Sequence, residues 1–236
     1  MGEANLMHIS LETPASAISC ALDKPLSHDA RLIIRPLALT DAPKIVEAIN
    51  ESLAELKQFM PWAHYPQTIE SQRTRIVTSI HDYWSGRDNV YGIFGATTNS
   101  FLGCSGLHRR TLNIRGLEIG YWIRSSLAGK GLATAVTRSL IVYGFEFLGL
   151  NRIQCCHNAK NVGSARVNDK CNLKIEGTLK NFESQATDEM IQNGWLGSNE
   201  IVIRGLCPED VPNLHWYDEV RSRIAVFDWL GQSAVS

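Results

Sequence analysis

Residues 118–133 constrain this chain more than any other stretch, because they predict a strand, a glycine-containing loop and a helix in direct succession. The loop reads Ala-Gly-Lys-Gly-Leu-Ala at residues 128–133. The first amides of a helix have no intrahelical partner and carry partial positive charge, and glycine lets a ligand come close to the backbone. The pattern favours a site for a phosphate-bearing ligand. The alternative is a plain strand–turn–helix connection.

The composition is that of an ordinary globular protein. The chain has 236 residues, of which 44% are hydrophobic and 20% charged, and its formal net charge is −1. These values argue against a basic nucleic-acid-binding domain. No apolar run reaches the length of about 18 residues that a membrane span needs, and the N-terminus has no secretory pattern. We therefore expect a cytoplasmic protein that contacts neither membrane nor nucleic acid directly.

The six cysteines and seven histidines show no spacing typical of a metal site. The cysteines form no Cys-x-x-Cys pair, and the histidines are scattered along the chain. A chain of this length does not depend on disulfides for stability, and the expected compartment is reducing. We therefore expect reduced thiols and no bound metal.

The order of predicted elements indicates one mixed α/β sheet. Strands are expected at residues 17–22, 31–37, 90–97, 101–109, 114–123, 151–158, 173–183 and 197–205. Helices are expected at residues 40–50, 53–60, 68–85, 132–148, 161–171 and 211–230. Thr40 is the expected N-cap of the first helix. We divide the chain into an N-terminal extension (1–29), one α/β domain (30–206) and a C-terminal helical extension (207–236).

Several short motifs, taken together and in this order, resemble the GNAT superfamily of N-acetyltransferases. They are Arg31-Leu-x-x-Arg-Pro-Leu, Met60-Pro-Trp, Glu118-Ile-Gly-Tyr-Trp, the glycine loop, Asn161-x-x-Ser, and Leu173-x-x-Glu-Gly. The resemblance covers residues 30–206 and is closest to the branch of ribosomal-protein N-terminal (serine/alanine) acetyltransferases. It implies a central, mixed but mostly antiparallel sheet flanked by helices, with central strands that splay apart to bind acetyl-CoA. One departure is Ala128, where the family usually has Arg or Gln.

The resemblance also implies where acetyl-CoA would bind. The pyrophosphate would lie on the backbone of Gly129, Lys130, Gly131, Leu132, Ala133 and Thr134. The pantetheine would pair with the strand end at Trp122, Ile123 and Arg124. The side chain of Lys130 either faces a phosphate or is a solvated loop lysine.

Asn161 and Ser164 match a family motif in which the Asn contacts CoA and the Ser lies near its sulfur as a candidate general acid. The alternative is helix capping, because Asn is a good N-cap residue. No tyrosine lies between Tyr143 and Tyr217 to take the acid's place, so Ser164 is the expected donor.

Two carboxylates compete for the role of general base. Glu183 follows the Leu173 motif and takes the base position by resemblance to the ribosomal-protein branch. Glu118 lies on the central strand, where other members of the superfamily place a base that works through water. The alternatives are an exposed strand-end carboxylate for Glu183 and a structural hydrogen bond for Glu118.

The expected acceptor is a primary amine, and a protein N-terminal α-amine is favoured. A small amine (polyamine, aminoglycoside or amino-acid-like metabolite) is the alternative within the class, and a non-catalytic acyl-CoA-binding module is the alternative outside it. The expected acceptor pocket is lined by Phe59, Met60, Trp62, His64 and Tyr65. The aromatic C-terminal helix either packs on its own domain or forms a homodimer.

Overall fold

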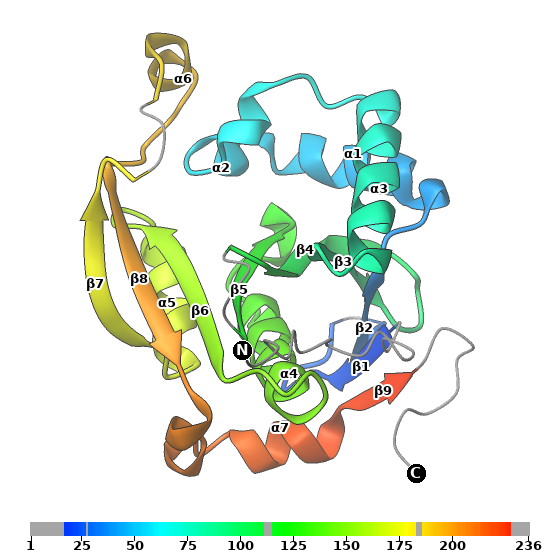
Figure 1. The fold of residues 1–236 in the computed structure, drawn as a ribbon. Helices are drawn as coiled ribbons and strands as arrows, with labels where there is room; N and C mark the ends of the chain where they lie inside the picture. The colour runs from blue at the N-terminus through cyan, green and yellow to red at the C-terminus, as the bar shows by residue number, and fades with distance from the viewer. Residues whose placement is uncertain (1–16, 27, 111–114, 183–185, 228–236) are drawn as a thin grey trace, which may run out of the picture.

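In the computed structural model, residues 17–26, 28–110, 115–182 and 186–227 are described. This part of the chain forms one nine-stranded sheet in the order β7-β8-β6-β5-β4-β3-β2-β1-β9 (Figure 1). The strands are β1 (Ala17–Ala21), β2 (Arg31–Pro36), β3 (Asp88–Gly95), β4 (Phe101–His108), β5 (Gly116–Ile123), β6 (Arg152–Asn158), β7 (Lys174–Lys180), β8 (Glu200–Leu206) and β9 (Ala225–Phe227). Every neighbouring pair is antiparallel except the parallel pair β5 and β6. The predicted mixed, mostly antiparallel sheet is confirmed.

Helices cover both faces of the sheet. They are α1 (Ala42–Glu51), α2 (Leu53–Lys57), α3 (Ile69–Trp84), α4 (Leu132–Glu146), α5 (Val162–Lys170), α6 (Asp188–Gln192) and α7 (Tyr217–Arg223). One hydrophobic core lies under α4, and a second lies under α1 and α3. Strand alternation divides β5 between them: Ile119 and Tyr121 contact the α4 core, and Trp122 contacts the other. The two faces of β5 therefore look into different environments.

The parallel pair β5 and β6 is hydrogen-bonded over only part of its length. Residues 116–118 pair with residues 152–154, and the pairing stops there. Beyond this point β5 keeps β4 as its partner up to Ile123, while β6 keeps β8 up to Asn158. The two strands therefore diverge in the middle of the sheet, as Figure 1 shows.

The start of the first helix differs from the prediction. A 3₁₀ turn (Leu39–Asp41) comes first, and α1 begins at Ala42 rather than after Thr40. The Asp41 carboxylate accepts hydrogen bonds from the Ala38 amide and the Arg35 guanidinium, both at 2.8 Å. Burial alone would raise the pKa of Asp41, but these two hydrogen bonds together hold it below its ordinary value. Asp41 thus caps the 3₁₀ turn that precedes α1.

The expected helix over residues 211–230 is also wrong as a single element. A 3₁₀ stretch (Pro208–Asn213) comes first, α7 follows, and the chain then turns into β9, which pairs with β1. Ile224, directly after α7, already has an extended backbone (φ −83°, ψ 146°). Val226 is buried in the sheet opposite Ile18, which stabilises an extended strand instead. Residues 228–230 lie outside the described part of the chain.

The C-terminal segment packs on its own domain. Trp216 is 2% exposed, and its indole Nε1 donates a hydrogen bond to Asn172 Oδ1 at 3.0 Å. The Arg138 guanidinium lies over the same ring, 5.0 Å from its centroid. This geometry favours intramolecular packing of Trp216, and a homodimer stays a prediction.

We predict that Trp216→Ala lowers the free energy of unfolding by about 3–5 kcal/mol, because it leaves a cavity in the α4 core. Trp84→Ala is the control, since Trp84 is 54% exposed and its loss should cost about 1 kcal/mol or less. Urea denaturation of the two variants measures both values. Equal losses would show that residues 214–217 are not part of the core.

Candidate active site

The divergence of β5 and β6 is the frame of the candidate site. Residues 119–123 of β5 do not pair with residues 155–158 of β6. Backbone groups at both strand edges are therefore open to another partner. An extended ligand with amide groups can take the place of the missing strand contacts. The splayed central strands that the sequence predicted are therefore present.

The glycine loop lies directly after this opening. Gly129 and Gly131 have φ angles of 74° and 85°, in the left-handed region that favours glycine. A Cβ atom at either position would meet nothing within 4 Å, so the glycines are needed for backbone conformation and not for space. The loop is open on its outer side.

The start of α4 offers unpartnered amides beside that loop. Gly131 is the N-cap and has no side chain to cap the helix. The Ala135 amide donates the first hydrogen bond of the helix, to the Gly131 carbonyl at 2.9 Å. The preceding amides at residues 132–134 have no intrahelical acceptor, and they lie at the positive end of the helix dipole. Lys130 is exposed and forms no ion pair with any residue the structure describes.

The start of α5 is capped by Asn161. Its Oδ1 accepts a hydrogen bond from the Ser164 amide at 2.9 Å, so this oxygen caps the helix. Contact between Asn161 and CoA stays a prediction.

Ser164 on α5 contacts Tyr121 on β5, one of the two diverging strands. The Tyr121 hydroxyl lies 3.0 Å from Ser164 Oγ and thus connects β5 to α5 across the opening. Burial raises the pKa of Tyr121 well above its ordinary value, so the hydroxyl keeps its proton at neutral pH. Tyr121 lies before the segment between Tyr143 and Tyr217 in which a donor tyrosine was expected, so it was not predicted. Strand alternation, which puts Tyr121 on the α4 face of β5, was the available signal.

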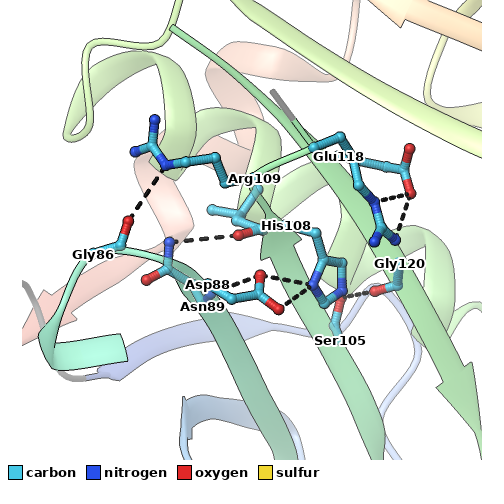
Figure 2. A network of polar contacts seen from close by, with 10 residues as sticks. Gly86, Asp88, Asn89, Ser105, His108, Arg109, Glu118 and Gly120 are labelled. Carbon is cyan, nitrogen blue, oxygen red and sulfur yellow. Dashed lines mark hydrogen bonds and ion pairs between the residues drawn. The ribbon is translucent and has the colours of Figure 1, made fainter. Parts of the chain in front are cut away.

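Glu118 lies at the last paired position of β5, opposite Gln154. Its Oε1 accepts hydrogen bonds from Arg110 Nε (3.0 Å) and Nη2 (2.9 Å), and its Oε2 accepts one from Gln154 Nε2 at 3.1 Å. Figure 2 shows Glu118 with dashed contacts to its carboxylate. Both oxygens are thus engaged by neighbouring side chains. Glu183, the other candidate base, lies outside the described residues.

The strand end that follows Glu118 is firmly held. Trp122 packs against Trp62, with 6.1 Å between ring centroids. The Arg124 guanidinium donates hydrogen bonds to Glu47 (3.1 Å) and Glu51 (2.6 Å) on α1, and its amide donates to Leu102. Arg124 therefore has a structural role, and contacts of Trp122, Ile123 and Arg124 with the cofactor stay a prediction.

Of the residues expected to line the acceptor pocket, Trp62 contacts Trp122 on β5, and the pocket itself stays a prediction. The His64 and Trp195 rings lie 6.1 Å apart, which joins the 3₁₀ turn Pro61–His64 to the loop after α6. The Leu196 and Gly197 amides donate hydrogen bonds to the Gln58 carbonyl, at 3.0 and 3.2 Å. Phe59, Met60 and Trp62 are half-buried, whereas Tyr65 is 70% exposed and points away from this packing.

Two absences concern the described part of the chain. None of its helices is long and apolar enough to cross a membrane. Its His, Cys, Asp and Glu side chains form no group of three or more that would suit a metal ion.

The sequence and the fold are similar to those of known acetyltransferases. The family model for the acetyltransferase (GNAT) domain matches residues 31–174. A putative ribosomal N-acetyltransferase from Bacillus subtilis, YdaF, is 31% identical over 151 residues, which cover 63% of this chain and 81% of that protein.

Solved structures agree with this result. A crystal structure of a probable acetyltransferase superimposes with a TM-score of 0.67 at 28% identity, covering 79% of this chain and 97% of the other. Mycobacterium smegmatis RimJ superimposes with a TM-score of 0.72 over 89% of this chain and 96% of its own, and at 19% identity it supports the fold alone.

The resemblance inferred from the motifs is confirmed, both for the superfamily and for its similarity to ribosomal N-acetyltransferases. The matched segment contains the diverging strands, the glycine loop and the start of α5. The chain belongs to the GNAT acetyltransferase family, and it is an N-acyltransferase.

Proposed function

We propose that this enzyme transfers the acetyl group of acetyl-CoA to a primary amine, and that the favoured acceptor is the α-amine of a protein N-terminus. The observation that carries the proposal is the divergence of β5 and β6 next to the uncapped start of α4. RimJ of Mycobacterium smegmatis was solved as a complex with CoA-disulfide, which supports a CoA ligand for this fold.

The donor would bind mainly through the backbone. The pyrophosphate would accept hydrogen bonds from the amides of residues 129–134, where the helix dipole favours negative charge. The pantetheine amides would pair with the open edge of β5 near Ile123. Backbone recognition explains why Ala128 need not carry the usual Arg or Gln, since the main-chain donors of the loop are unchanged.

Transfer requires two proton movements. The ammonium must lose a proton before its nitrogen attacks the thioester carbonyl, and the departing thiolate must gain one. Ser164, hydrogen-bonded to Tyr121, would supply the proton to the thiolate. Glu183 and Glu118 are the carboxylate candidates for the base. Glu118 is the weaker candidate, because both of its oxygens already accept hydrogen bonds from Arg110 and Gln154.

The choice of acceptor rests on relatives and on amine chemistry. YdaF is named a putative ribosomal N-acetyltransferase, and a further structural neighbour is the ribosomal L7/L12 α-N-protein acetyltransferase RimL in complex with coenzyme A. An α-amine has a pKa of about 7.7–8.0, so roughly a tenth is neutral at pH 7. A lysine side chain is neutral in only about 1 of 2,500 molecules. An α-amine therefore loses its proton to a weak base more easily than a lysine side chain does. A ribosomal acceptor would place the enzyme in the cytoplasm.

A glycine pair at the two ends of α4 tests donor binding. We predict that Gly131→Ala raises the Kd for acetyl-CoA about tenfold, because an alanine strained by about 1–2 kcal/mol shifts the amides at the helix start. Gly149→Ala is the matched control: its φ is 59°, and its Cβ would also meet nothing within 4 Å. Titration calorimetry gives both constants. Equal Kd values for the two variants would contradict a pyrophosphate site at residues 129–134.

A panel of acceptors tests the reaction. We expect CoA release, followed with a thiol reagent, with peptides that have a free Ser or Ala N-terminus. We expect at least tenfold lower kcat/KM with the same peptides when the α-amine is blocked and an internal lysine is free. Faster turnover of polyamines, aminoglycosides or free amino acids would favour the small-amine alternative. Tight acetyl-CoA binding without turnover of any amine would favour a non-catalytic module.

A further inference from the structure

Three titratable residues lie in a row across the central strands. The sheet register places His108 on β4 directly opposite Asp88 on β3 and, on its other side, opposite Glu118 on β5. Directly opposite residues of neighbouring strands present their side chains on the same face. Figure 2 shows Asp88, His108 and Glu118 side by side on that face.

The His108 ring is oriented by Asp88. Its Nδ1 lies 2.9 Å from Asp88 Oδ1 and 3.1 Å from Oδ2, and the Asn89 amide donates a hydrogen bond to Oδ1 at 3.0 Å. Burial would raise the pKa of Asp88, but the His108 hydrogen bond and charge, with the Asn89 amide, hold it below its ordinary value. A carboxylate at Nδ1 favours the tautomer with its proton there, which leaves the Nε2 lone pair free to accept one.

The Nε2 atom of His108 lies close to the backbone of two glycines, beside the diverging strands. A Cβ atom on Gly106 would lie 2.6 Å from Nε2, and one on Gly120 would lie 3.2 Å from it. These two glycines are cross-strand partners, so they leave space for the ring on β4 and β5 together. Gly120 belongs to the part of β5 that has already separated from β6. Nε2 accepts no hydrogen bond from any residue that the structure describes, and the His108 side chain is 20% exposed.

This face of β5 contacts a residue of the expected acceptor pocket. Glu118, Gly120 and Trp122 alternate along it, and Trp122 packs against Trp62 of the expected acceptor pocket. Ser164 and Tyr121 lie on the opposite face, on the side of α5. An amine that approaches over Gly120 would therefore meet His108 first, while the thiolate would depart toward Ser164.

We propose that His108 is the general base of the transfer and that Asp88 is its positioning residue. This inference rests on the proposed function and names a base for the same site. The acceptor ammonium gives a proton to His108 Nε2, and the neutral nitrogen attacks the thioester carbonyl carbon. The C–S bond then breaks, and the leaving thiolate takes the proton of Ser164 Oγ. The second proton leaves the attacking nitrogen to solvent, and solvent returns a proton to Ser164. His108 finally releases its proton to solvent.

The neighbouring charges are compatible with this role. Asp88 from β3 contacts the ring, Glu118 lies opposite His108 on β5, and Arg110, just after β4, pairs with Glu118. Arg110 neutralises Glu118 through contacts of 3.0 and 2.9 Å, so Asp88 is the carboxylate that acts on the imidazole directly. The competing interpretation is that the Asp88–His108 pair only ties β3 to β4.

The test uses full-length His108→Gln, His108→Ala and Asp88→Asn with saturating acetyl-CoA and the best acceptor from the panel, between pH 6 and 9. We expect His108→Gln to lower kcat at pH 7 about 100-fold with an unchanged Kd for acetyl-CoA. Its rate should then follow the neutral fraction of the acceptor amine and recover as the pH rises. Added imidazole should restore much of the rate of His108→Ala. Asp88→Asn should lower kcat and leave the Kd for acetyl-CoA unchanged, because the imidazole loses the carboxylate that orients it.

His81→Gln is the control and should keep the wild-type profile, since the His81 side chain is 66% exposed on α3. The proposal is overturned if a folded His108→Gln keeps kcat within about twofold, or if imidazole restores nothing to His108→Ala while the acetyl-CoA Kd rises. Turnover of the acceptor panel by the wild type tests the proposed function. The ratio of kcat values of variant and wild type on the same acceptor tests this inference. A small-amine acceptor would thus overturn the first and leave the second open to the same measurement.

Discussion

The partial pairing of β5 with β6 is the constraint on which the rest of the site depends. Three residue pairs hold the strands together at one end, and the outer neighbours β4 and β8 hold them apart beyond it. Unpaired strand edges inside a sheet are costly unless something else satisfies them. A ligand with peptide-like amides would do this, which is why we propose the donor site here. The glycine loop and the first turn of α4 extend that site toward an anionic group.

In the proposed mechanism, the two faces of β5 separate the two proton movements of the reaction. Tyr121 contacts Ser164 on the α5 side, while Gly120 lies under the His108 ring on the side of Trp122. Strand alternation alone produces this division, since consecutive side chains point to opposite faces. A base on one face and an acid on the other suit an amine that enters from one side and a thiolate that leaves on the other. The glycine pair Gly106–Gly120 provides the space that the base needs.

Local patterns predicted the parts of the site that are contiguous in sequence. The strand, loop and helix over residues 118–133 follow from alternation and glycines, and the Asn161 cap follows from its residue type. Contacts between distant elements were missed, because the Asp88–His108 pair depends on sheet register and the Tyr121–Ser164 contact depends on how α5 packs against β5. The C-terminal helix was wrong because burial of Val226 beside β1 overrides helical periodicity. Tertiary pairing, rather than propensity, decided each of these cases.

A crystal structure of the protein with acetyl-CoA tests the central claim most directly. The account predicts pantetheine between residues 119–123 of β5 and 155–158 of β6, with the pyrophosphate on the amides of residues 129–134. It also predicts the acetyl group beside Gly120, with the sulfur toward Ser164. Acetyl-CoA bound elsewhere, or β5 and β6 closed into full pairing in the complex, would contradict the account.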